Sequence, residues 1–206
     1  MKLKDNSFTV KAERAILFRV VLTQDRSDEE EPLSELCRLA ETAGAKVVQK
    51  VVQNKAEIDP VYYIGKGKAS ELADVSTELD IDVLICDDDL APSQIKNLEK
   101  VIGKKVIDRS ELILDIFATR AKTFQAKLQV ELAQLEYTKP RLKRMWTHLS
   151  RIEGGIGTRG PGEKQLEVDK RIVSRKIHYL RKKLHEIEKR QERLVESRKE
   201  YSTVSI

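Results

Sequence analysis

The chain has few cysteines and lacks long apolar segments, two features that define whole classes of protein. It contains two cysteines, Cys37 and Cys86, each in an apolar stretch and neither near a second cysteine or a histidine at metal-ligand spacing. They are predicted to be buried, reduced core residues of a cytoplasmic protein. No apolar run approaches the roughly 20 residues that cross a bilayer, and no signal-peptide segment opens the sequence.

Catalytic constellations are equally scarce. The three histidines, His148, His178 and His185, all fall in helical patterns, and none is paired with a nucleophile or a carboxylate in a catalytic arrangement. The acidic triplet 87–89 follows an apolar run that ends at Cys86, where open α/β sheets place ligands, and could hold Mg²⁺. Helix capping and surface charge explain the triplet better, so no catalytic machinery and no resident metal are predicted.

Charge is distributed unevenly along the chain. Residues 1–138 carry 20 basic and 25 acidic side chains, whereas residues 139–206 carry 19 basic and 9 acidic ones. The overall net charge of +5 therefore hides a strongly basic C-terminal third. An asymmetry of this kind indicates that the C-terminal third contacts nucleic acid or another acidic surface.

Apolar runs alternate with helical patterns over residues 1–108. Strands are predicted at 15–22, 46–52, 61–64, 83–86 and 106–107, and helices begin near Pro32, after Gly67 and near Pro92. This alternation predicts an α/β subdomain with a mostly parallel sheet of four to five strands and flanking helices.

Helical periodicity replaces the alternation over residues 109–200. One pattern runs from Ser110, a candidate N-cap, to Leu135, and Pro140 interrupts it. A heptad seam follows at residues 173, 177, 180, 184, 187, 191 and 194. Before the loop, the helical pattern resumes after Pro140 at Leu142, Met145, Trp146, Leu149 and Ile152. Together with this helix, the heptad seam predicts a long antiparallel two-helix coiled coil with a glycine-rich loop, 154–163, at its tip. Residues 203–206 are typical of the start of a strand, and residues 201–206 are expected to begin a further domain.

The loop 154–163 is the most distinctive segment of the sequence. Five glycines and Pro161 exclude a helix or strand there, and Arg159 gives the loop a cation. The glycines match neither the Rossmann fingerprint, because no strand precedes them, nor a P-loop, because Glu163 follows where lysine is required. The loop is predicted to be the tip of a basic arm that contacts RNA or DNA, and the arm's cations are Lys139, Arg141, Lys143, Arg144, Lys170, Arg171, Arg175, Lys176, Arg181, Lys182 and Lys183.

A second, weaker glycine motif follows the predicted strand 61–64. Gly65, Lys66, Gly67 and Lys68 open a helix, so their backbone amides and lysines could hold a phosphate. A tight strand-to-helix turn explains the two glycines equally well. A nucleotide-binding (ATP) α/β module and a coiled-coil protein-interaction arm therefore remain alternatives to a nucleic-acid-binding module.

Several segments together resemble one known family. Tyr62 to Lys68, Leu90 to Gln94, Val106 to Arg109 with Leu112 to Phe117, Lys127 to Leu135, Trp146 to Ser150 and the loop 154–163 are similar to the N-terminal region of the HflX family of ribosome-binding GTPases. In that family a P-loop and the rest of a GTPase domain follow a strand resembling 203–206. GTP and Mg²⁺ are thus implied for a longer parent protein, and these 206 residues should not hydrolyse GTP alone.

The resemblance also implies partners and contacts. It implies docking on the large (50S) ribosomal subunit, close to 23S rRNA at the peptidyl transferase centre, in ribosome splitting, rescue or subunit biogenesis. The chain's own C-terminal GTPase domain is the second implied partner. The implied rRNA contacts are Arg151, Gly154, Gly155, Gly157, Thr158, Arg159, Gly160 and Gly162, flanked by Lys143, Arg144, Arg171 and Arg175.

Overall fold

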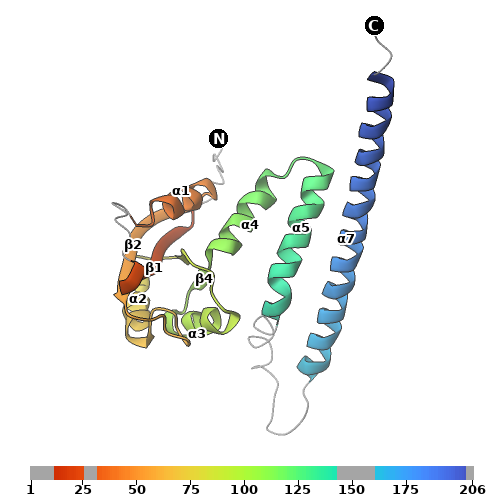
Figure 1. Ribbon diagram of the computed structural model, residues 1–206. Coiled ribbons are helices and arrows are strands. Elements are labelled where there is room, and N and C mark those ends of the chain that lie inside the picture. Colours follow the sequence, from red (N-terminus) through yellow and green to blue (C-terminus); the bar gives the residue numbers. More distant parts are fainter. Residues whose placement is uncertain (1–11, 26–31, 143–160, 203–206) are drawn as a thin grey trace, which may run out of the picture. The chain divides into compact units, whose positions relative to one another are not determined.

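A computed structural model describes residues 12–25, 32–142 and 161–202, with the side chains of 161–166 and 198–202 left aside (Figure 1). The chain divides into two compact units, Met1–Ile116 and Phe117–Ile206. Residues 154–160 of the glycine-rich loop, Trp146, His148 and the predicted strand 203–206 lie outside the described residues. The last three residues of the predicted loop, 161–163, instead form the first turn of the helix α7 (Pro161–Ser202), where proline is accepted because the first backbone N–H groups of a helix need no partner within it.

The first unit contains a parallel sheet of four strands in the order β2-β1-β3-β4. The strands are β1 (Arg14–Leu22), β2 (Lys46–Lys55), β3 (Val83–Cys86) and β4 (Lys105–Ile107). The helices are α1 (Ser34–Thr42), α2 (Lys66–Glu78), α3 (Pro92–Ile102) and the start of α4 (Arg109–Arg120), and a short 3-10 helix η1 (Thr23–Asp25) follows β1. The predicted parallel α/β sheet with flanking helices is confirmed.

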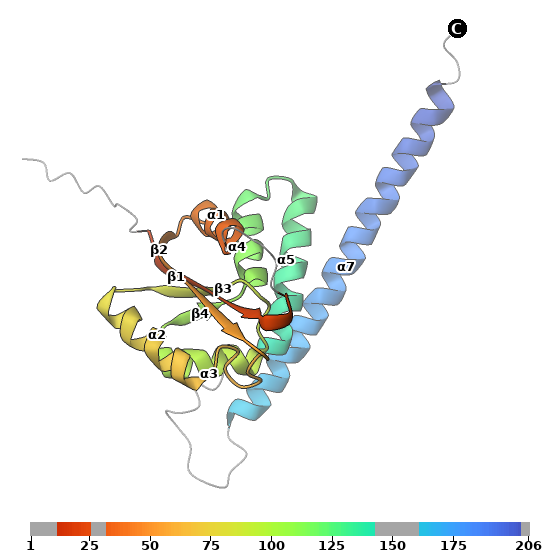
Figure 2. The same cartoon turned by 60° about the vertical axis from the view of Figure 1, so that its left-hand side comes forward.

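Alternating side chains of the strands build two apolar layers. On β1, Ile16 and Phe18 pack with α2 and α3, whereas Ala15 and Leu17 pack with α1 and α4. Figure 2 shows α2 and α3 on one side of the sheet and α1 on the other. Because both faces are covered, β1 and β3 are apolar almost throughout, as a buried parallel strand requires.

The predicted strand 61–64 is wrong. The Asp59 carboxylate accepts the backbone N–H groups of Val61 at 2.8 Å and of Tyr62 at 2.7 Å. Tyr63 has a positive φ of 65° and forms only an isolated bridge with Asp59. This Asx-type turn ties the segment to itself, so Tyr63 and Ile64 are buried in the core without adding a fifth strand.

The predicted continuous helix from Ser110 to Leu135 is also corrected. Asp108, rather than Ser110, caps α4, because its carboxylate accepts the N–H of Glu111 at 2.9 Å. The helix then ends at Arg120, and α5 (Phe124–Thr138) begins with Thr123 as its N-cap, whose hydroxyl accepts the N–H of Ala126 at 3.1 Å. Pro140 lies in a short 3-10 helix, η2 (Lys139–Arg141), directly after α5.

The second unit pairs α5 with the long helix α7 (Pro161–Ser202), and both views show them side by side. Leu128 of α5 is buried with Leu180 and Leu184 of α7. Gln191 donates to Gln125 at 2.9 Å, and Arg181 pairs with Glu136 at 2.6 Å, so the two helices run antiparallel.

The heptad seam of α7 is occupied over only part of its predicted length. Ile177, Leu180 and Leu184 are buried, but Leu194 is 51% exposed. The structure therefore describes a long C-terminal helix with a short packed seam. A coiled coil that reaches the glycine-rich loop stays a prediction, because residues 143–160 are not among those described.

Candidate functional site

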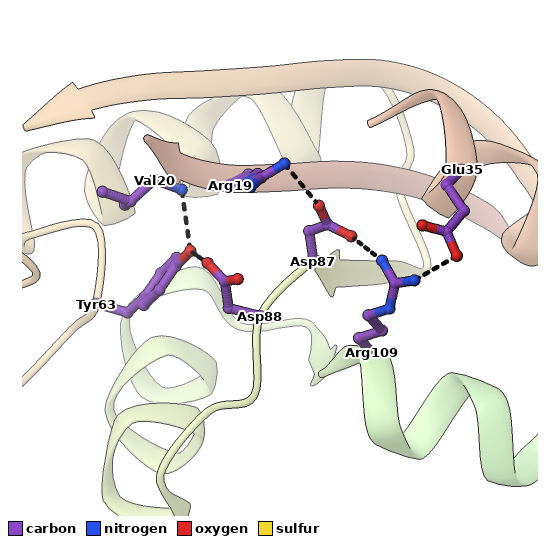
Figure 3. Close-up of polar contacts among 7 residues, drawn as sticks. All are labelled: Arg19, Val20, Glu35, Tyr63, Asp87, Asp88 and Arg109. Atoms are coloured by element: carbon purple, nitrogen blue, oxygen red, sulfur yellow. Dashed lines mark hydrogen bonds and ion pairs between the residues drawn. The ribbon is translucent and has the colours of Figure 1, made fainter. Parts of the chain in front are cut away.

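The carboxyl edge of the sheet holds a network of charged side chains (Figure 3). Asp87, directly after β3, is paired with Arg109 at 3.0 Å and with Arg19 of β1 at 3.4 Å. Arg109 also contacts the Glu35 carboxylate of α1. The hydrogen bond from Arg109 lowers the pKa of Glu35, and the bond to Glu35 raises the pKa of Arg109. One guanidinium thus joins the start of α4 to β3 and α1.

Tyr63 anchors the other end of this edge. Its side chain is 2% exposed, its hydroxyl accepts the N–H of Val20 at 3.0 Å, and it donates to the Asp88 carboxylate. Burial raises the pKa of Tyr63 and of the neighbouring Cys86 thiol, which keeps both groups protonated. The edge is therefore organised by internal pairs that hold the fold together.

The acidic triplet 87–89 does not assemble a metal site. Within the described ranges, no group of three His, Cys, Asp or Glu side chains is placed to hold a metal ion. Asp87 and Asp88 instead accept from Arg109 and Tyr63. Both carboxylates are thus already used within the protein. Asp87 neutralises the Arg109 guanidinium, and Asp88 accepts the hydrogen bond of the Tyr63 hydroxyl.

The motif 65–68 lies at the N-terminus of α2. Gly65 is the N-cap residue with φ 87° and ψ 152°, a backbone conformation that residues other than glycine rarely adopt. A Cβ on Gly65 would lie 3.4 Å from the Lys55 ammonium and 3.9 Å from the Asp59 carboxylate. Lys68 pairs with Glu71 at 2.5 Å. An ammonium and a carboxylate thus both lie close to the helix N-terminus. Phosphate binding by Gly65, Lys66, Gly67 and Lys68 stays a prediction.

The basic arm is described along α7 and at Lys139 and Arg141, where Arg141 donates to the carbonyl of Tyr137 at 3.0 Å. Between Lys170 and Lys183 the helix carries seven lysine and arginine side chains and no carboxylate. Arg171 and Arg175 are exposed; Arg171 pairs with Glu167 at 3.6 Å, and Arg175 donates to the carbonyl of Arg171. Gly162 lies in the first turn of α7. The other predicted contacts, namely Lys143, Arg144, Arg151, Gly154, Gly155, Gly157, Thr158, Arg159 and Gly160, fall outside the residues that the structure describes.

Besides Arg171, two of the seven cations form ion pairs within the unit. Lys176 pairs with Glu131 at 2.6 Å and Arg181 with Glu136 at 2.6 Å, both across the α5–α7 contact. Within the described ranges, Arg175 and Lys182 make no ion pair. Their charges are therefore available to an external anion.

One surface cluster was missed in the sequence. Lys183 lies between two exposed rings, with its ammonium 5.2 Å from the centre of the Phe124 ring and 5.4 Å from that of Tyr179. Its ammonium also donates to the Tyr179 hydroxyl at 3.1 Å. Tyr179 could have been found as an aromatic one position before a seam leucine. Phe124 could not, because its helical spacing in the sequence is that of a core residue.

The sheet, the helical unit and their order along the chain define a class of protein. Residues 30–118 match the family described as GTP-binding GTPase N-terminal, and residues 120–198 match GTP-binding GTPase Middle Region. The junction of the two matches falls within two residues of the end of α4. The chain is thus built from the N-terminal and middle regions of a class of GTP-binding GTPases.

Individual relatives narrow the class. The chain is 47% identical over 180 residues to a GTPase HflX of Lacrimispora saccharolytica, covering 87% of this chain and 43% of the relative. It is 44% identical over 186 residues to a GTPase HflX of Escherichia coli, covering 90% and 43%. The chain belongs to the HflX family of GTPases, and it spans less than half of the length of these relatives.

A solved structure shares the fold. The crystal structure of SsGBP in complex with GDP is 27% identical, with a TM-score of 0.62, and the match covers 88% of this chain and 46% of that one. A GTP-binding protein from Sulfolobus solfataricus, also in complex with GDP, gives 27% identity and a TM-score of 0.56. In this chain, none of the helices described is long and apolar enough to cross a membrane.

Proposed function

We propose that this chain is the ribosome-contacting region of an HflX-type GTPase. It associates with the large (50S) ribosomal subunit in the cytoplasm, contacts 23S rRNA near the peptidyl transferase centre, and acts in ribosome splitting, rescue or subunit biogenesis. It also modulates the GTPase domain of the parent protein, where GTP and Mg²⁺ are bound. The observation that carries the proposal is the carboxylate-free run of seven cations from Lys170 to Lys183 on a helix of an HflX-family chain.

The cation run favours a polyanion over a protein partner. A helix that serves only for solubility carries charges of both signs, as α7 does from Glu186 onward. Between Lys170 and Lys183 the charge has one sign, and Arg175 and Lys182 have no ion-pair partner in the described part of the chain. Such cations gain most from phosphate groups, because each contact releases condensed counterions.

Nucleotide binding by the sheet has less support. At the N-terminus of α2 the Lys55 ammonium is accompanied by the Asp59 carboxylate, and Lys68 is already paired with Glu71. The carboxyl edge of the sheet is occupied by the pairs of Asp87 and Asp88. In addition, this sequence contains no Gly-Lys-Ser/Thr segment, so its own residues do not fit the GTP and Mg²⁺ of the parent enzyme.

Co-sedimentation of the 206-residue chain with purified large ribosomal subunits, across a salt series, tests the proposal. Saturable binding that weakens steeply with salt is expected, and deletion of residues 155–162 should weaken it further. The paired change Arg175→Gln with Lys182→Gln should lower the slope of log K against log salt by about 1 to 2.

The matched control removes the same charge elsewhere on α7. Arg190 and Arg193 lie among glutamates in the sequence. The double change Arg190→Gln with Arg193→Gln should therefore leave both the affinity for the subunit and its salt slope nearly unchanged. Equal losses from the two pairs would mean that only net charge matters. Absence of binding by the wild-type chain would refute ribosome contact by this region.

A further inference from the structure

We propose that Phe124, Tyr179 and Lys183 form a site for unpaired nucleotides of RNA, with bases stacked on the two rings and a phosphate held by the lysine. The inference rests on the proposed function and adds to it a second mode of recognition. Phosphate contacts along α7 are blind to base pairing, whereas ring stacking requires a base that has left a duplex.

The exposure of the two rings is the first observation. Phe124 is 60% exposed and Tyr179 is 56% exposed, although each ring would stabilise the unit more if it were buried. Buried positions are close at hand, because Leu180, the residue after Tyr179, is 2% exposed. Tyr179 is thus on the outer side of a helix whose seam is filled by other residues.

The setting of Tyr179 is the second observation. On a helix, the neighbours of a residue on the same face stand three and four positions away. For Tyr179 these four positions hold Arg175, Lys176, Lys182 and Lys183. Every neighbour of the ring along the helix face is therefore a cation, and a base stacked on the ring would have its flanking phosphates within reach of lysine or arginine.

Lys183 joins the two rings into one site. Its ammonium lies within 6 Å of both ring centres and donates to the Tyr179 hydroxyl at 3.1 Å. The lysine comes from α7, whereas Phe124 is the first residue of α5, so the site depends on the packing of the two helices. Cationic side chains beside exposed aromatic rings are the combination by which single-stranded nucleic acids are held without sequence preference.

The charge decides between RNA and an apolar protein partner. A protein helix docked on Tyr179 would have to desolvate Arg175 and Lys182, which have no ion-pair partner among the described residues, and burying such charges is costly. An RNA strand instead supplies the phosphates that neutralise them. An acidic peptide would do the same without needing the rings, and it is therefore included in the test.

The test compares three fluorescent probes: a short unstructured RNA of CAA repeats, an RNA duplex of matched length and a polyglutamate peptide. Tyr179→Leu should weaken single-stranded RNA binding about 5- to 100-fold and leave the salt slope unchanged, because a stacked base is lost without a charge. Phe124→Leu should behave in the same way. Lys183→Gln should weaken binding and also lower the salt slope by about 0.7.

Two controls make the result specific. Tyr179→Phe keeps the ring and should retain the affinity of the wild type to within about threefold. Phe117→Leu removes an equally exposed ring, at 56%, whose neighbours on α4 include Arg120 as the one cation, and it should have no effect. Duplex RNA should respond to Lys183→Gln but not to Tyr179→Leu, because paired bases cannot stack on the ring.

The outcomes separate this site from the proposed function. Binding of single-stranded RNA that is unchanged by Tyr179→Leu, or tighter binding of polyglutamate than of RNA, overturns the nucleotide site. If those variants still co-sediment with large ribosomal subunits, the proposed function stands without it. If the wild-type chain binds neither RNA nor subunits, both inferences are overturned.

Discussion

Removing the hydroxyl of Tyr63 should measurably destabilise the first unit, although it removes a single atom from the core. In Tyr63→Phe the ring keeps its packing against Phe18, whose ring centre is 6.1 Å away in an edge-on arrangement. Two hydrogen bonds are lost, because the buried N–H of Val20 loses its acceptor and Asp88 loses a donor. No apolar volume is lost.

The expected effect follows from the burial of the groups left behind. An unsatisfied buried donor costs about 1–3 kcal/mol, whereas Asp88 is half-buried and can regain part of its hydration. We therefore expect Tyr63→Phe to lower the free energy of unfolding of this unit by about 2 kcal/mol. With a urea dependence of about 1–3 kcal/mol per molar, the midpoint should fall by about 1 M.

Hydrogen–deuterium exchange of peptides from β1 and β3 along a urea series measures this unit separately from the helical one. The control is Tyr62→Phe, which removes the same hydroxyl from the preceding residue, whose side chain is only partly buried. It should shift the midpoint by much less. If the two variants unfold at the same urea concentration, the assignment of the Val20 and Asp88 bonds to fold stability is refuted.

Three further predictions concern the rest of the described chain. Leu180→Ala should cost the α5–α7 unit about 3 kcal/mol, because the side chain is 2% exposed, while Leu194→Ala at 51% exposure should cost almost nothing; thermal unfolding followed by circular dichroism compares them. Gly65→Ala should destabilise the first unit by about 1–2 kcal/mol because its φ is 87°, whereas Gly67→Ala, inside α2 with open space around it, should stabilise it by about 0.5–1 kcal/mol; two changes of the same sign in urea midpoint would contradict this. Asp59 accepts the N–H groups of Tyr62 and Val61, and the bond from Tyr62 holds its pKa below the ordinary value of 3.8, so its stabilisation is present above about pH 4 and is lost as the pH falls through the lowered value. Asp59→Asn should therefore narrow the difference between urea midpoints at neutral and acidic pH, and an unchanged difference would refute the role of this carboxylate.

The local sequence pattern was enough to predict elements that have the same surroundings along their whole length. The apolar run 15–22 became β1 because both faces of that strand are covered, and Gly65 marks the start of α2 because only glycine adopts that φ easily. The turn at 61–64 was missed because Val61 to Ile64 have side chains typical of strands. The group that forms the turn is the carboxylate of Asp59, which lies outside this apolar run.

The candidate sites depended more on pairings distant in sequence. Arg109 and Glu35 are 74 residues apart, and nothing in either segment indicates that they meet. The cluster of Phe124 and Tyr179 likewise forms only when α5 lies against α7. The basic run 170–183, by contrast, is a property of one helix and is visible directly in the sequence.

The strand order of the sheet determines when each strand can pair with its neighbours while the protein is being synthesised. Translation delivers β1 first, yet β1 occupies a central place between β2 and β3, and its second edge stays open until Cys86 has left the ribosomal tunnel. At about 5–20 residues per second, the nascent chain carries an apolar strand with at least one unpaired edge for roughly 3–13 seconds. No hairpin can close early, because every pairing is parallel and waits for a crossover. We therefore expect the newborn chain to be most prone to aggregation, and most dependent on chaperones, in the interval between the synthesis of Leu22 and that of Cys86.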